Sequence, residues 1–234
     1  MLYQGKESGT LEKEDDYEKK TQYTNMMKFV WLILAISMLF TCSSLADEAD
    51  DLAAEGNLLY DQDFYDEALV VLDQALAIDP ENLEALNGKG KTLKSLGRYE
   101  EAIEEYEKAI SIDPSYKKAW NNKGIVLTYL EQYDEAVEMY NEAIKIDPEY
   151  AKAYSNLAWC LNLAGRYEEA LDNAKNATDL LPDYPKGWIN HADALFALGR
   201  YNEAVTSYDA ALLLDPDQSD AKNGKARAIE KMDV

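Results

Sequence analysis

The sequence predicts an all-α solenoid in which antiparallel helix pairs stack along the chain. Proline recurs every 34 residues, at Pro80, Pro114, Pro148, Pro182 and Pro216. Because proline has no backbone N–H and cannot continue a helical hydrogen-bond ladder, each of these residues marks the end of a helix. A period of this length accommodates one helix-turn-helix unit, which buries its apolar face only against its neighbours.

Five repeats follow when each proline is placed at position 32 of its unit: 49–82, 83–116, 117–150, 151–184 and 185–218. Alanine occupies two positions in every repeat: Ala68, Ala102, Ala136, Ala170 and Ala204 at position 20, and Ala75, Ala109, Ala143, Ala177 and Ala211 at position 27. Position 8 is always Gly or Ala, so two helix backbones can approach closely there. Position 15, the expected turn, is Gly in three repeats but Asp63 and Glu131 in the others.

This pattern of small residues and prolines resembles the tetratricopeptide repeat family over residues 49–218. The resemblance implies a right-handed superhelix in which the first helix of each repeat, helix A, lines a concave groove. After the last proline, Ser219 to Lys231 is expected to form one more helix with Arg227 on its polar outer side. Residues 219–234 would then cap the stack, because a terminal repeat otherwise exposes an apolar face.

Positions 2 and 6 of helix A face the groove in the family that the sequence resembles. Position 2 supplies Lys118, Lys152 and Lys186, and position 6 supplies Asn122, Asn156 and Asn190. Residues four apart share one face of a helix. Asparagine can donate to and accept from a peptide backbone, and lysine can pair with carboxylates. We therefore predict that these residues contact a partner; the alternative is that asparagine is merely common at position 6 and lysine solvates the rim.

Apolar side chains also fall at groove positions of repeats three to five: Ile125, Tyr129, Trp159, Ile189 and Phe196. Grouped exposed aromatic residues are typical of a binding patch, although Trp159 could instead pack against the neighbouring helix. The first two repeats present mostly polar groove residues. The sequence therefore predicts that a partner engages the C-terminal half of the stack.

The N-terminal region divides into two parts that precede the repeats. Residues 1–26 are polar and mixed in charge, so we expect a disordered extension or an incorrectly assigned start, with Met27 as an alternative first residue. Residues 27–46 contain an uncharged apolar run that is typical of a signal peptide or a membrane anchor. Cys42 follows most of this run, so a lipoprotein with a lipid on this cysteine is a further alternative. Lys28 precedes the run and acidic residues follow it, which predicts an extracytoplasmic location.

Composition narrows the function classes. The formal net charge of −22 disfavours nucleic-acid binding. Two cysteines, Cys42 and Cys160, and a single His191 give no metal or disulfide spacing and no catalytic constellation. We predict a non-catalytic scaffold without cofactor or small-molecule substrate, which binds a protein or peptide in its groove. The alternatives are an assembly protein that forms homo-oligomers through repeat ends, and an accessory subunit of a membrane or envelope complex.

Overall fold

The computed structural model describes residue 27 and residues 45–232. A helical segment covers residues 45–61. It is followed by helices α2 (Tyr65–Ile78), α3 (Leu83–Ser95), α4 (Tyr99–Ile112), α5 (Lys117–Tyr129), α6 (Tyr133–Ile146), α7 (Ala151–Leu163), α8 (Tyr167–Leu180), α9 (Pro185–Ala197), α10 (Tyr201–Leu214) and α11 (Ser219–Met232). The all-α prediction is therefore confirmed.

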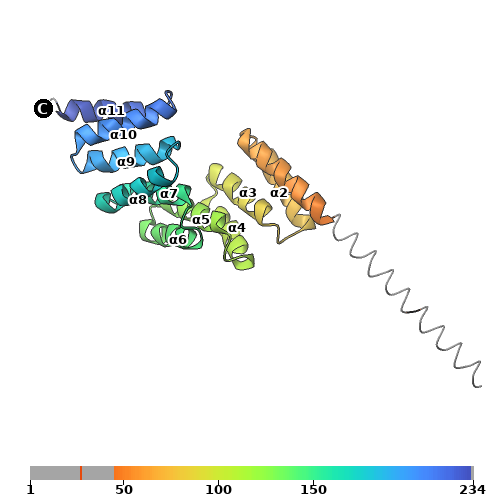
Figure 1. Ribbon diagram of the computed structural model, residues 1–234. Helices are drawn as coiled ribbons and strands as arrows, with labels where there is room; N and C mark the ends of the chain where they lie inside the picture. Colours follow the sequence, from red (N-terminus) through yellow and green to blue (C-terminus); the bar gives the residue numbers. More distant parts are fainter. Residues whose placement is uncertain (1–26, 28–44, 233–234) are drawn as a thin grey trace, which may run out of the picture.

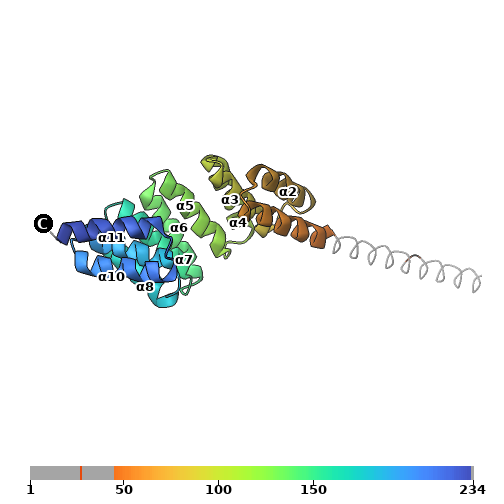
Figure 2. The ribbon, with the colours of Figure 1, turned by 90° about the horizontal axis from the view of Figure 1, so that it is seen from above.

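The helices pack as antiparallel pairs in chain order, and each pair contacts the next (Figure 1). Helices α3, α5, α7 and α9 are the first helices of their repeats, and α11 closes the stack beyond α10. Seen from above, the pairs follow one another from the segment 45–61 to α11 (Figure 2). The row curves, so its N-terminal and C-terminal ends flank a concave side.

The predicted extension (1–26) and most of the apolar segment (27–46) lie outside the described residues. Within residues 45–232, no helix combines the length and the apolar character needed to cross a membrane.

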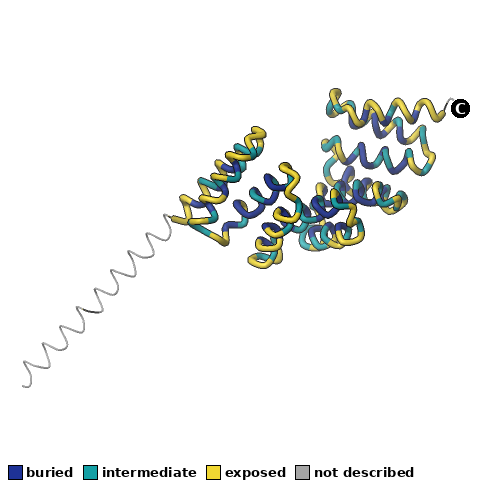
Figure 3. Tube along the Cα trace, turned by 180° about the vertical axis from the view of Figure 1, so that it is seen from behind, coloured by how far each residue is buried: buried dark blue, intermediate teal, exposed yellow. Residues whose placement is uncertain are grey.

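The core forms between the two helices of a repeat, where a small residue meets a large one. Tyr106 and Tyr140, both at position 24, have no exposed surface. A Cβ atom added to Gly90 would lie 2.5 Å from Tyr106 Cε1, and one added to Gly124 would lie 2.8 Å from Tyr140 Cε1. Glycine is thus required at these crossings because the tyrosine ring fills the space. Buried residues accordingly lie on the sides of the helices that face one another (Figure 3).

Each helix A ends in the same way, with a left-handed residue at position 15. The φ angles are 75° at Gly97, Gly165 and Gly199, 63° at Asp63 and 60° at Glu131. The turn therefore keeps its geometry where glycine is absent, although a residue with a Cβ atom is strained in this region. The prediction of a turn at position 15 holds in all five repeats.

Asp-Pro ends the second helix in four repeats by a local hydrogen bond. The Asp113 carboxylate accepts the backbone N–H of Ser115 at 2.8 Å, and Asp79, Asp147 and Asp215 accept from the residue two positions on in the same way. Aspartate competes with the helix for backbone donors, which makes it a terminator. Leu181 replaces aspartate in the fourth repeat and cannot make this bond.

Two buried tyrosines allow a matched test of the core. The Tyr140 hydroxyl lies 3.1 Å from Thr128 Oγ1, whereas the equally buried Tyr106 hydroxyl has no hydrogen-bond partner among the described residues. We expect Tyr140→Phe to lower the free energy of unfolding by about 1 kcal/mol, because a buried hydrogen bond is lost. Tyr106→Phe should be neutral or stabilising, because it removes an unpaired buried hydroxyl. Urea denaturation measures both; equal losses would contradict the assignment.

Candidate partner-binding groove

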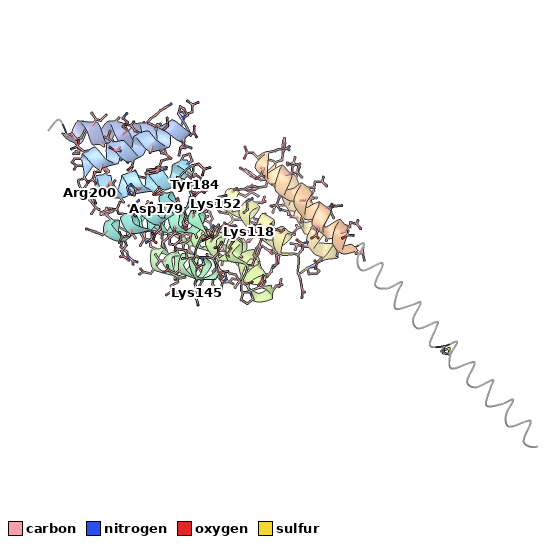
Figure 4. The ribbon with its side chains drawn as sticks, viewed as in Figure 1. Lys118, Lys145, Lys152, Asp179, Tyr184 and Arg200 are labelled. Atoms are coloured by element: carbon pink, nitrogen blue, oxygen red, sulfur yellow. The ribbon has the colours of Figure 1, made fainter. Side chains whose placement is uncertain are left out.

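Two adjoining cavities occupy the concave side, with volumes of about 960 and 520 Å³. The larger cavity is lined chiefly from α3, α5, α7 and α9, and the smaller one adds α11. We call these two cavities together the groove. Lys118, Lys152 and Tyr184 lie on its side of the stack, whereas Lys145 points from the opposite, outer side (Figure 4). First helices therefore supply the groove because they form the inner layer of the curved stack.

The structure brings most of the sequence-predicted contact residues into this groove. The larger cavity is lined by Lys118, Asn122, Ile125, Lys152, Asn156 and Lys186. The smaller cavity is lined by Ile125, Tyr129, Asn156, Trp159, Lys186, Ile189 and Asn190. Residues from three successive repeats thus share one continuous surface, and Ile125, Asn156 and Lys186 belong to both cavities.

A chain of side-chain amides runs along the floor of the groove. Asn156 Nδ2 donates to Asn121 Oδ1 at 2.9 Å, Asn121 Nδ2 to Asn122 Oδ1 at 3.0 Å, and Asn122 Nδ2 to Asn87 Oδ1 at 2.7 Å. Each amide has two N–H donors and two oxygen lone pairs, so these bonds do not exhaust its capacity. The chain connects three repeats. Asn87 and Asn121 are buried, so the half-buried Asn122 and Asn156 are the amides that can also bond to a bound backbone.

Asn190 differs from the other two predicted asparagines because its amide is used internally. Only 8% of the residue is exposed, and Nδ2 donates to the Ser155 carbonyl at 2.8 Å and to Ser155 Oγ at 3.0 Å. Asn190 therefore joins α9 to α7. Of the three position-6 residues, Asn122 and Asn156 are the better placed to meet a partner.

The three predicted lysines also differ in their surroundings. Lys118 Nζ lies 2.6 Å from Glu84 Oε1, the residue at the same position of the preceding repeat. Lys152 and Lys186, both exposed, form no ion pair with any described residue. Two of the three predicted cations are therefore free to attract an anionic group.

Aromatic rings form one wall of the smaller cavity. The ring centroids of Tyr129 and Trp159 are 5.4 Å apart in an edge-to-face arrangement, and Tyr99 stacks on the other side of Tyr129 at 5.9 Å. Tyr129 remains 53% exposed. Such pairs hold rings in a fixed geometry, so this wall offers a preformed apolar surface.

Phe196 does not line either cavity within the described structure, contrary to the prediction. Its ring packs 5.4 Å from that of Tyr201, and the Arg227 guanidinium lies over it at 5.2 Å. The cause is α11, which covers this end of α9. Arg227 itself lines the smaller cavity, which corrects the prediction that it lies on the outer side of the closing helix.

Asn121 from α5 and Arg227 from α11 line the groove although the sequence did not predict them there. Asn87, Lys91 and Lys94 from α3 stand at predicted polar groove positions of the second repeat, but the partner was expected at the C-terminal half. The groove therefore also uses the second repeat and the closing helix, beyond the predicted C-terminal half. Asn121 stands at position 5, which also faces the groove in the family that the sequence resembles, so the repeat pattern contained the signal that would have found it.

The charge balance of the groove differs from that of the whole chain. Its basic lining residues are Lys91, Lys94, Lys117, Lys118, Lys152, Lys186 and Arg227, and its acidic ones are Glu84, Asp147, Glu149, Asp193 and Asp220. The complete chain has 45 acidic and 23 basic residues. The concave side is thus locally cationic within an acidic protein.

The described residues contain no group of three or more His, Cys, Asp or Glu side chains that could hold a metal ion. His191 Nδ1 lies 3.0 Å from Ser207 Oγ, and burial lowers the pKa of the His191 imidazole. Burial raises the pKa of the Cys160 thiol. Both shifts favour neutral side chains, which fits packing roles.

Asn190 provides a test of the internal role assigned to it. We expect Asn190→Ala to lower the free energy of unfolding by about 1–3 kcal/mol, because the buried Ser155 hydroxyl loses its amide partner. Asn176→Ala, at an exposed site on α8, is the matched control and should change stability by less than about 0.5 kcal/mol. Urea denaturation distinguishes them; a similar small change in both would refute the assignment.

Sequence models of the tetratricopeptide repeat match most of the chain. Two models described as Tetratricopeptide repeat match residues 117–183 and 161–228, and a third, described as TPR repeat, matches 56–97 and 90–128. A search of curated proteins gives no significant match.

Solved structures of similar fold cover about three quarters of the chain or more. The Thermus thermophilus protein TTC0263, a thermophilic TPR protein, superposes with a TM-score of 0.69 at 24% identity, over 78% of this chain and 99% of its own. Pseudomonas aeruginosa pilF gives 0.69 at 24%, over 80% and 87%. YrrB, described as a TPR protein with an unusual peptide-binding site, gives 0.56 at 24%, over 75% and 90%.

Proposed function

Because this chain belongs to the tetratricopeptide repeat family, we propose that it is a non-catalytic scaffold whose groove binds an extended segment of a protein partner. The fold typically mediates protein–protein interactions. The observation that carries the proposal is the groove itself. Its floor is the amide chain from Asn87 to Asn156, and its wall is the aromatic pair of Tyr129 and Trp159.

This combination suits an extended peptide for physical reasons. An extended backbone has unpaired N–H and C=O groups along its length, and side-chain amides can satisfy both kinds. An aromatic wall can bury an apolar side chain of such a segment. A few contacts of this kind typically supply most of the binding energy. The description of YrrB as having a peptide-binding site gives a precedent for peptide binding on a similar fold.

A double change in the groove tests this function. We expect Lys152→Glu combined with Trp159→Ala to abolish capture of the partners that crosslinking and affinity purification recover with the unaltered chain. The double variant removes one free cation and the larger ring of the wall. Helicity by circular dichroism should not change, because Lys152 is exposed and Trp159 is only half-buried.

Lys145→Glu is the matched control, because this exposed lysine lies on the outer side of the stack (Figure 4). It introduces the same charge change outside the groove and should leave the set of partners intact. An identical set of partners with the double variant and with the control would refute the groove function.

We further propose that the repeats lie outside the cytoplasm. The support is the sequence pattern at 27–46, with Lys28 before the apolar run and Asp47 and Glu48 after it. In intact cells that produce the full chain, added protease should digest the repeats without lysis. Protection that persists until the cytoplasmic membrane is broken would contradict this location.

A further inference from the structure

The smaller cavity places two lysines from distant repeats against the same space. Lys94 belongs to α3 in the second repeat, and Lys186 belongs to α9 in the fifth. The curvature of the stack brings them together although they are far apart in the sequence. Burial lowers the pKa of the Lys94 ammonium, and the positive charge of Lys186 lowers it further.

Neither lysine forms an ion pair with the described part of the chain. Two carboxylates line the same cavity, but Asp193 accepts a hydrogen bond from the Tyr208 hydroxyl and Asp220 is exposed on α11. The cavity therefore has three cationic side chains, Lys94, Lys186 and Arg227, against these two carboxylates, and the two ammonium groups repel each other. Like charges that share a partly desolvated space raise the free energy of the unbound protein, and an anion between them would remove that cost.

We propose that the space between Lys94 and Lys186 binds a side-chain carboxylate of an acidic partner segment, whose neighbouring apolar side chain packs on Trp159 and Tyr129. This inference rests on the proposed function and specifies the chemistry of the partner. Charge complementarity carries it: the chain is strongly acidic overall, and the groove is the place where unpaired cations gather.

The arrangement favours a protein segment with several carboxylates over a single small anion. Besides Lys94 and Lys186, Lys152 and Lys91 line the adjoining cavity. Lys91 lies over the Tyr60 ring at 4.1 Å and forms no ion pair among the described residues. The amide chain lines the same adjoining cavity, where Asn122 and Asn156 can bond to a backbone. A single carboxylate would pair with the lysines at one place in the groove, whereas an extended acidic segment could pair with lysines at more than one.

The test uses the full chain and a fluorescent peptide in which Asp and Phe are separated by Gly, with both ends blocked. An otherwise identical peptide with Asn in place of Asp has no charge. We expect the acidic peptide to bind about tenfold more tightly than the Asn peptide, and added KCl to reduce this difference. Equal affinity of the two peptides would overturn the carboxylate site but leave the groove function standing. Absence of acidic-peptide binding would also overturn it.

Lys94→Gln assigns the effect to the proposed site. We expect this variant to lose about tenfold in affinity for the acidic peptide and little for the Asn peptide, while the unliganded variant is as resistant to urea as the parent, or more so. That combination separates binding from a structural role, since a structural lysine would lower stability when removed. Lys145→Gln on the outer side is the matched control. If Lys94→Gln and Lys145→Gln bind the acidic peptide equally, the site is wrong.

Discussion

The close approach of the two helices within each repeat is the constraint on which the rest of the structure depends. The rings of Tyr106 and Tyr140 lie so close to Gly90 and Gly124 that no Cβ atom fits between ring and backbone. This contact sets how near the outer helix lies to the inner one. The two layers of helices follow a curved row, and the first helices line its concave side. The groove therefore depends on packing in the core.

Much of the fold could be predicted because its determinants recur with a fixed period. The prolines, the two alanine positions and the small residue at position 8 mark the same places in every repeat. The left-handed conformations of Asp63 and Glu131 show that tertiary context imposes the turn even without glycine. The third repeat read alone would not have revealed this turn, because glutamate rarely adopts the left-handed region, whereas aspartate does so more often.

The groove was harder to predict because its properties depend on contacts between repeats. The repeat positions of Lys118 and Asn190 predicted groove contacts, but not the pairing of Lys118 with Glu84 or the bond of Asn190 to Ser155. Phe196 was assigned to the groove from its position in the repeat; the closing helix was predicted, but not the packing of Tyr201 and of its Arg227 on the Phe196 ring. The meeting of Lys94 with Lys186 depends on the curvature of the entire stack, which no local pattern contains.

The amide chain on the groove floor has a direction. Asn156 donates from repeat four to Asn121 in repeat three, Asn121 donates to Asn122 within α5, and Asn122 donates to Asn87 in repeat two, so the bonds follow one another in a single sense from repeat four to repeat two. Aligned hydrogen bonds polarise one another. A segment lying along this floor meets a surface that differs at its two ends, so the floor can distinguish the two orientations of an extended chain.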